Sequence, residues 1–351
     1  MAKCHAAPIE VDEVQGKGNV SGDRYFVGVD IGGTNIKSGV VSSEGETISK
    51  LSAPSVLNAG RDAGLEHLFE TVEDVVQLSG VSWSEIGGIG VAAPGTMDIK
   101  AGIVFHPFNM PGWENLPLRD LVSNRFGKPA VLQNDANAAA FGEYWLGAAR
   151  GAESLMFWTL GTGIGGGIVM GGQIVTGAHS HAGECGHLIL QMEGGPRSEH
   201  GIHGSLELYA GAKALVRRCE AALASGARSI IEDQLKQGQK LTPLLIAVCA
   251  SDGDALADRL IMETAHYMAI GTVNIIHTIN PEVVLFGGAM TFGQGNTELG
   301  RRFLAKLREE IRAHTFPIPG EKTKVDYASL GKDAGYLGAA GCIRSAIGGG
   351  K

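Results

Sequence analysis

Two stretches of the chain share one order of elements: a short apolar run, a glycine-rich turn and a second apolar run. The first is RYFVGVDIGGTNIKSGVV at residues 24–41, and the second is SLMFWTLGTGIGGGIVM at residues 154–170. β-Branched and aromatic runs that flank a glycine turn predict antiparallel hairpins. Because the unit occurs twice, we expect a duplicated architecture with two domains. The length of 351 residues agrees with two domains.

Helical and strand-like segments alternate along the rest of the chain. Residues 64–80 have helical periodicity, residues 86–95 indicate a buried strand, and a strand at 130–133 leads into a helix at 136–146. In the second half, further helices are predicted at 204–223, 252–279, 296–316 and 332–347, and further strands at 281–290 and 323–330. This alternation is typical of an α/β fold.

Charge and cysteine usage exclude several classes of protein. The net charge of −8 argues against a surface built for nucleic acid or for an anionic membrane. No apolar run reaches the roughly 18 residues of a membrane helix. The first residues lack the apolar core of a secretory signal, so we predict a disordered leader over residues 1–24. The five scattered cysteines suit reduced thiols in a cytoplasm.

The second glycine turn contains the spacing G-x-G-x-x-G at Gly161, Gly163 and Gly166, which also occurs at dinucleotide sites. Such a site requires a helix directly after the glycines, whereas this sequence continues as a strand. Two matching turns instead predict phosphate binding by backbone N–H groups. Asp30, in the first turn, suits a Mg²⁺ ion that also contacts phosphate. A nicotinamide-dependent oxidoreductase remains an alternative that titration with NAD would test.

Six motifs resemble the ROK (repressor, open reading frame, kinase) family of sugar kinases and repressors. They occur in the family's order over residues 25–346 and are VGVDIGGTN, GVAAPG, QNDANAAAFGE, LGTGIGGG, AGECGH and INPEVVLFGGAM. The resemblance implies a two-domain α/β fold of the actin and hexokinase (ribonuclease H-like) type, with the active site in the interdomain cleft. We expect a small N-terminal domain at 25–134 plus 333–351 and a large C-terminal domain at 135–332.

The same resemblance favours the kinase branch of the family. Family repressors carry an N-terminal helix-turn-helix of several dozen residues, whereas only 24 residues precede the first predicted strand here. Within the kinase branch, glucokinases are the nearest likeness. The implied reaction is phosphorylation of D-glucose to glucose 6-phosphate, with ATP and Mg²⁺ as cofactors. The implied partners are a hexose and a second copy of the chain in a homodimer, without nucleic acid or membrane.

The resemblance also assigns roles to single residues. Asp135 matches the catalytic base, which accepts the proton of the sugar hydroxyl; a helix N-cap is the alternative interpretation. The implied sugar contacts are Asn109, Asn134, Glu184, His187 and Glu207. The implied ATP and phosphate contacts are Asp30, Gly32, Gly33, Thr34, Gly161, Thr162, Gly163, Gly287 and Gly288, with Asp30 also the Mg²⁺ ligand. For Asn109, ordinary turn chemistry is an equal alternative. For the Gly287–Gly288 pair, the equal alternative is a strand end before a helix.

A histidine-rich segment at residues 179–207 resembles the family's zinc segment in spacing but not in ligands. Family kinases carry C-x-C-G-x-x-G-C-x-E there, and its three thiolates bind zinc together with a histidine. Ser198, His200 and Ser205 occupy the thiol positions in this chain. A structural zinc site normally needs four N or S ligands, so we expect no structural zinc. The alternative is a site of three histidines, His187, His200 and His203.

Three further questions stay open at this stage. The polar contacts are shared by kinases for fructose, N-acetylmannosamine and allose, and polyphosphate is an alternative donor. A protein that senses sugar without phosphorylating it would keep the same sugar contacts. A panel of substrates separates the kinases, and ADP release on addition of glucose separates a kinase from a sensor.

Overall fold

The computed structural model describes residues 10–11, 24–107, 110–198 and 201–348, and the chain divides into two units. Unit 1 comprises Met1–Gly151, Ile174–Ala182 and Lys332–Lys351, and unit 2 comprises Ala152–Gln173 and Gly183–Gly331. In the described part of the chain, every helix is too short or too polar to span a membrane.

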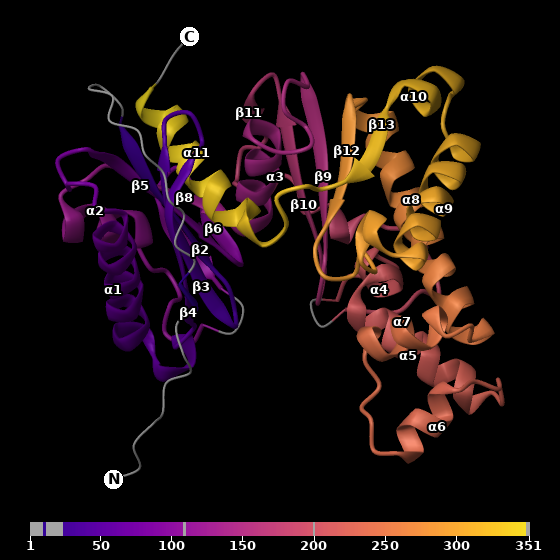
Figure 1. The fold of residues 1–351 in the computed structure, drawn as a ribbon. Coiled ribbons are helices and arrows are strands. Elements are labelled where there is room, and N and C mark those ends of the chain that lie inside the picture. The colour runs from indigo at the N-terminus through magenta and orange to yellow at the C-terminus, as the bar shows by residue number, and fades with distance from the viewer. Residues whose placement is uncertain (1–9, 12–23, 108–109, 199–200, 349–351) are drawn as a thin grey trace. The chain divides into compact units, whose positions relative to one another are not determined.

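Unit 1 is built on a six-stranded sheet (Figure 1). Its strands are β1 (Glu10–Val11), β2 (Tyr25–Ile31), β3 (Asn35–Ser42), β4 (Thr47–Pro54), β5 (Ile86–Ala93) and β8 (Ala130–Asn134). The order across the sheet is β1-β4-β3-β2-β5-β8. Strands β2, β3 and β4 pair antiparallel, whereas β5 runs parallel to β2 and β8 parallel to β5. A small hairpin of β6 (Thr96–Asp98) and β7 (Ile103–His106) follows β5.

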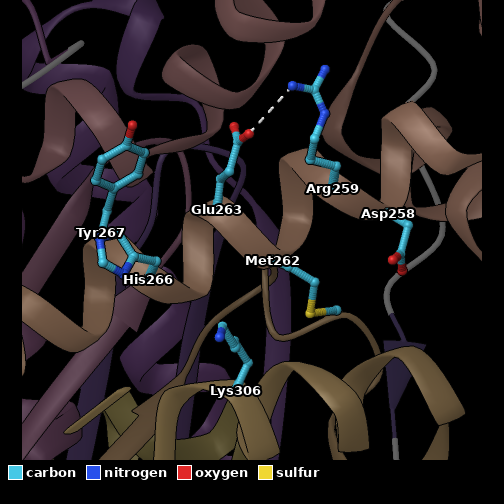
Figure 2. A pocket seen from close by; sticks show the side chains of 7 residues that line it. All are labelled: Asp258, Arg259, Met262, Glu263, His266, Tyr267 and Lys306. Atoms are coloured by element: carbon cyan, nitrogen blue, oxygen red, sulfur yellow. Dashed lines mark ion pairs between the residues drawn. The ribbon is translucent and has the colours of Figure 1, made fainter. Parts of the chain in front are cut away.

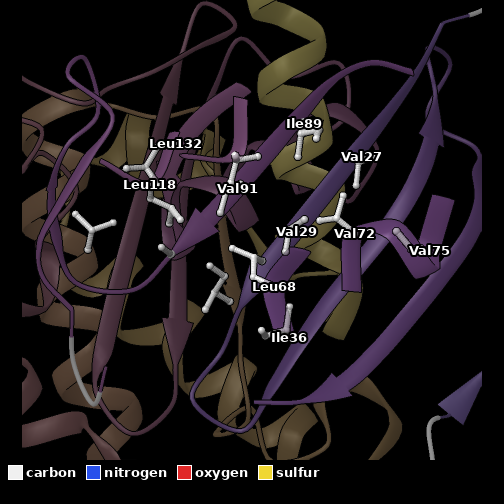
Figure 3. Packing of buried hydrophobic residues seen from close by; sticks show 14 of the residues in the cluster. Val27, Val29, Ile36, Leu68, Val72, Val75, Ile89, Val91, Leu118 and Leu132 are labelled. Atoms are coloured by element: carbon white, nitrogen blue, oxygen red, sulfur yellow. The ribbon is translucent and has the colours of Figure 1, made fainter. Parts of the chain in front are cut away.

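Helices cover both faces of this sheet (Figure 1). They are α1 (Arg61–Ser79) and α2 (Leu118–Phe126) on one face, and α3 (Asp135–Trp145) and α11 (Ala334–Ile347) on the other. Successive side chains of β2 point to opposite faces of the sheet. Val27 and Val29 pack into the apolar cluster with Leu68 of α1 (Figure 3). Gly28 faces α11, where a Cβ atom would overlap the carbonyl oxygen of Tyr336, so the helix lies directly on the sheet.

Unit 2 contains a five-stranded sheet with the order β11-β10-β9-β12-β13 (Figure 1). Its strands are β9 (Ser154–Leu160), β10 (Ile164–Met170), β11 (Gln173–Ile174), β12 (Val283–Gly287) and β13 (Lys324–Tyr327). Its helices are α4 (Glu207–Ala210), α5 (Ala212–Ala224), α6 (Ile231–Lys236), α7 (Pro243–Ser251), α8 (Ala255–Ile279), α9 (Glu298–His314) and α10 (Pro317–Lys322). Strands β9 and β10 form an antiparallel hairpin, and β12 lies parallel to both β9 and β13.

Both predicted hairpins are present, as β2–β3 and β9–β10. The helix predicted at 204–223 is interrupted at Gly211, which separates α4 from α5. The segment between α5 and α7, whose sequence predicted no element, contains α6.

Three observations differ from the expected domain boundaries. Residues 174–182, expected in the C-terminal domain, belong to unit 1. Residues 135–151 lie in unit 1, because α3 packs closely on α11: a Cβ atom on Gly338 would overlap the carbonyl oxygen of Ala138. The leader expected over residues 1–24 falls mostly outside the described residues. Its described part includes Glu10–Val11, which pairs with β4 as a short strand.

Candidate active site

The first glycine turn joins β2 to β3 and places Asp30 near the end of a buried strand. The Gly32 N–H donates to the Asn35 carbonyl at 3.0 Å and closes the turn. Asp30 lies opposite Lys37 of β3 in the strand register. A Cβ atom on Gly335, at the start of α11, would overlap the Asp30 carboxylate, so the carboxylate lies against that helix.

Burial is the main influence on the Asp30 carboxyl. It raises the pKa of Asp30 above its usual value, and the positive charge of Lys37 opposes this shift. A cation next to the carboxylate would favour its charged form. Among the described residues, no group of three or more His, Cys, Asp and Glu side chains could hold a metal ion. A single carboxylate is the kind of ligand that Mg²⁺ takes from a protein when phosphate and water supply the others.

The start of α3 separates the roles of two adjacent residues. Asn134 is the N-cap: its Oδ1 accepts hydrogen bonds from the N–H groups of Ala136 at 3.0 Å and Asn137 at 3.2 Å. Asp135 follows as the first helical residue, and its Oδ1 accepts from the Ala136 N–H at 2.8 Å. Capping thus accounts for Asn134, and the alternative interpretation of Asp135 as the N-cap is wrong.

Gln133 contributes to this arrangement, although it was not among the predicted site residues. It is buried on β8, and its Oε1 accepts from the Asn134 N–H at 2.8 Å and from Asn137 Nδ2 at 3.2 Å. These bonds fix the junction between β8 and α3 on both sides of Asp135. Its position directly before the Asn-Asp pair is the one signal in the sequence that could have indicated it.

The second glycine turn joins β9 to β10 in unit 2. The Gly161 N–H donates to the Gly163 carbonyl at 3.0 Å, and Thr162 is exposed between them. The end of β12 lies beside this turn, because the Met290 N–H donates to the Leu160 carbonyl at 3.0 Å. Gly288 has a φ of 92° and lies against the Leu160 backbone, where a side chain would overlap it. The structure thus brings the predicted pair Gly287 and Gly288 to the Gly161–Gly163 turn.

The segment Glu184–His187 packs on the beginning of β10. A Cβ atom on Gly186 would overlap the carbonyl oxygen of Ile164, so only glycine allows this contact. His187 Nε2 lies 4.0 Å from Glu184 Oε2, and both side chains are partly exposed. The Glu207 carboxylate reaches the same strand, where its Oε2 accepts from the Ile164 N–H at 2.8 Å. Three of the predicted sugar contacts therefore lie around the first residues of β10.

The ROK family model matches residues 26–345. The chain belongs to the ROK family. It is 33% identical to a glucokinase of Thermotoga maritima, over 92% of this chain and 98% of that protein. It is 30% identical to a xylose repressor of Caldicellulosiruptor bescii, over 92% of this chain and 78% of that protein.

A solved structure of another ROK protein has the same fold. The glucokinase of Streptomyces griseus, in complex with glucose and AMPPNP, superposes with a TM-score of 0.72 at 32% identity, over 91% of this chain and 99% of that one. The present ROK protein therefore has the two-domain actin-like α/β fold.

Of the residues predicted from the family motifs, Asn109 lies outside the described part of the chain.

The zinc segment of the family has lost its thiolates in this ROK protein. Ser198 Oγ accepts a hydrogen bond from the Ile202 N–H at 3.1 Å, and the Ser198 N–H donates to the Ile202 carbonyl at 2.8 Å. Ser205 is buried, and its hydroxyl has no partner among the described residues. Burial raises the pKa of the nearby Cys185 thiol to about 12, with a smaller contribution from the charge of Glu184.

These donors do not fit structural zinc, because two hydroxyls and a protonated thiol are poor ligands for it. Ser198 and Ser205, two of the three residues at the thiol positions, make no bond that only a metal site would need: Ser198 bonds to Ile202, and Ser205 is buried. The three-histidine alternative includes His200, which lies outside the described residues, so it stays a prediction.

A groove lies between α8 and α9 of unit 2 (Figure 2). Its volume is about 300 Å³. Its charged side chains neutralise one another or their neighbours: Glu263 pairs with Arg259 at 3.7 Å, and Lys306 pairs with Glu310 at 2.8 Å. The groove shares none of the glycine turns and strand ends described above. It is therefore not the candidate active site.

Proposed function

We propose that this ROK protein is a hexokinase-type phosphotransferase that transfers the γ-phosphoryl group of ATP to D-glucose. The observation that carries the proposal is the junction of β8 and α3, where Asn134 caps the helix and Asp135 is not needed for that purpose. An acidic residue fixed there by its neighbours suits a general base for a sugar hydroxyl. The family membership and the glucokinase relatives support the same assignment.

The chemical step is a displacement at phosphorus. The sugar hydroxyl oxygen forms a bond to the γ-phosphorus while the bond from that phosphorus to the β,γ-bridging oxygen breaks, and ADP leaves with the electron pair. Asp135 accepts the hydroxyl proton. Backbone N–H groups of the Gly32–Thr34 and Gly161–Gly163 turns hold the phosphate oxygens, where negative charge is concentrated. The Gly32 and Gly161 N–H groups are not among them, because they close the turns. Asp30 would hold a Mg²⁺ ion directly or through water, and the ion would supply positive charge next to the phosphates.

The sugar is held in this proposal by Asn109, Asn134, Glu184, His187 and Glu207. Carboxylates and imidazoles accept and donate several hydrogen bonds, which suits a ligand with many hydroxyls. We place glucose first because the glucokinase of Streptomyces griseus binds glucose together with AMPPNP. Kinases for fructose, N-acetylmannosamine or allose remain the alternatives for this site.

A sensor that binds sugar without phosphorylating it is the second class of function, since a xylose repressor is among the relatives. Asp30 and Asp135 favour the kinase, because a binding protein needs neither a magnesium ligand nor a base. We also propose that the protein acts as a homodimer in a reducing cytoplasm. Its described cysteines, Cys185, Cys219, Cys249 and Cys342, are free thiols.

A substrate panel tests this function. Purified protein is mixed with MgATP and with glucose, fructose, N-acetylmannosamine, allose or no sugar, and ADP release is followed. The proposal predicts the highest kcat/KM with glucose and little release without sugar. Inorganic polyphosphate in place of ATP tests the alternative donor. Binding of glucose without ADP release would favour the sensor.

A further inference from the structure

The Glu207 carboxylate accepts a hydrogen bond from the residue that follows the second glycine turn. Its Oε2 accepts from the Ile164 N–H at 2.8 Å, across 43 positions of sequence. Ile164 is the first residue of β10, immediately after Gly163. A Cβ atom on Gly163 would overlap Glu207 Oε2, so the carboxylate lies directly against the turn. Glycine at position 163 is what allows this approach.

The backbone around α4 holds the other end of the same turn. The Ala212 N–H donates to the Gly161 carbonyl at 3.3 Å, and the Gly211 N–H donates to the Glu207 carbonyl at 2.9 Å. The side chain of Glu207 thus fixes the exit of the turn, and the backbone after α4 fixes its entrance. Both ends of the turn are therefore held by α4 or by the residues that follow it.

The segment that carries two of the proposed sugar contacts pairs with the chain just before Glu207. The chain after His187 runs antiparallel to the chain before Glu207: Ile189 pairs with Ser205, and the Leu206 N–H donates to the Leu188 carbonyl at 2.8 Å. Gly186 packs on the carbonyl of Ile164, the same residue whose N–H binds Glu207. The Glu207 carboxylate and the segment that carries Glu184 and His187 therefore both contact Ile164, the residue directly after the phosphate turn.

We propose that Glu207 is a positioning residue for the phosphate donor as well as a sugar contact, and that its carboxylate couples the two. The inference rests on the proposed function. A carboxylate accepts several hydrogen bonds at once, so Oε2 keeps the Ile164 N–H while the other oxygen accepts from a sugar hydroxyl. A bound sugar then fixes the carboxylate, and the carboxylate fixes the exit of the turn. A kinase built in this way orders its phosphate site when sugar is present.

Hydrogen exchange of the backbone amides tests the bond without any substrate. In Glu207→Ala, the amide of Ile164 loses a charge-assisted partner, and we expect its exchange to become roughly 10-fold faster or more. Gly163→Ala should produce the same change, because its Cβ atom displaces the carboxylate. Gly161→Ala is the matched control for exchange, since a Cβ atom there meets nothing within 4 Å. Thermal melts of all variants show whether each one folds.

Binding of MgAMPPNP without sugar tests the role in donor binding. We expect Glu207→Ala to raise the Kd for MgAMPPNP by roughly 10-fold. Glu207→Gln should stay within about threefold, because the amide oxygen still accepts from Ile164. Glu184→Gln is the matched control: it changes a proposed sugar contact that has no hydrogen bond to the turn, and it should leave this Kd within about twofold of the parent value.

Addition of glucose to the parent protein tests the coupling, and the proposal predicts slower exchange over residues 161–166. If exchange at Ile164 and the Kd for MgAMPPNP are unchanged in both Glu207→Ala and Gly163→Ala, Glu207 has no role beyond the sugar. If glucose binds and leaves exchange over the turn unaltered, the coupling is wrong. If the parent binds neither glucose nor nucleotide, the proposed function fails and the coupling with it, while the exchange data still report on the bond itself.

Discussion

Asn134 and Asp135 are adjacent, yet only Asn134 caps α3. The cap residue has extended backbone angles, φ −67° and ψ 144°, and its side chain accepts two backbone N–H groups, whereas Asp135 already belongs to the helix. Asn and Asp are equally good cap formers, so residue type alone does not show which of the two caps the helix. What decides between them is the residue at which β8 ends.

A first prediction concerns the stability that this cap provides. Asn134→Ala removes the acceptor of two hydrogen bonds and should lower the free energy of unfolding by about 1 kcal/mol. Urea denaturation measures the change. Asn134→Asp is the matched control, since its carboxylate caps as well and should restore most of the loss. A parent-like stability of the alanine variant would contradict the assigned cap.

A second prediction follows from the raised pKa of Asp30. Because burial raises its pKa, the folded chain holds this proton more tightly than the unfolded chain does. The contribution of Asp30 to stability therefore falls as pH rises from the unfolded pKa, about 3.9, through the folded pKa. Asp30→Asn does not titrate there, so its melting temperature should rise relative to the parent across this window and then level off. Melts from about pH 4 to about pH 8 test this, and parallel curves or the opposite trend would contradict it.

A third prediction concerns magnesium. Asp30→Ala should raise the Mg²⁺ concentration needed for half-maximal activity and lower kcat, while glucose still binds. Kinetic titration with Mg²⁺ and calorimetric titration with glucose separate the two effects. Asp62→Asn is a suitable control, since Asp62 is an exposed carboxylate paired with Arg61 on α1. Unchanged magnesium dependence of Asp30→Ala would count against its role.

A fourth prediction is that the protein purifies and works without structural zinc. Elemental analysis of untagged protein should find far less than one zinc per chain, and a strong zinc chelator in excess Mg²⁺ should leave activity intact. The triple variant Ser198→Cys, His200→Cys and Ser205→Cys is the positive control, since it restores the family's three thiols next to His187 and should take up zinc. Zinc near one equivalent in the parent protein would overturn the prediction.

The sequence predicted those elements whose signals are local. The β2–β3 and β9–β10 hairpins follow from apolar runs that flank glycine turns, and both are present. The break between α4 and α5 could not be predicted, because the helical periodicity continues through it. The Ala212 N–H donates to the Gly161 carbonyl at 3.3 Å, a contact with a distant turn that replaces a bond within the helix.

Only part of the site could be predicted from the sequence. Motifs indicated which residues matter, but not how they act on one another. The bond from Ile164 to Glu207 joins residues 43 positions apart, and the contact of Asp30 with Gly335 joins the first hairpin to the last helix. Such pairs depend on how the elements pack, which no local pattern encodes.

The central claim is that Asp135 is the base for transfer of a phosphoryl group to glucose. The most direct measurement is the rate of glucose 6-phosphate formation by Asp135→Asn, compared with the parent at saturating MgATP and glucose. Asn keeps the size of the side chain and removes the proton acceptor, so we expect kcat to fall by roughly 100-fold or more, with unchanged melting temperature and glucose affinity. A kcat within a few-fold of the parent value would contradict the account.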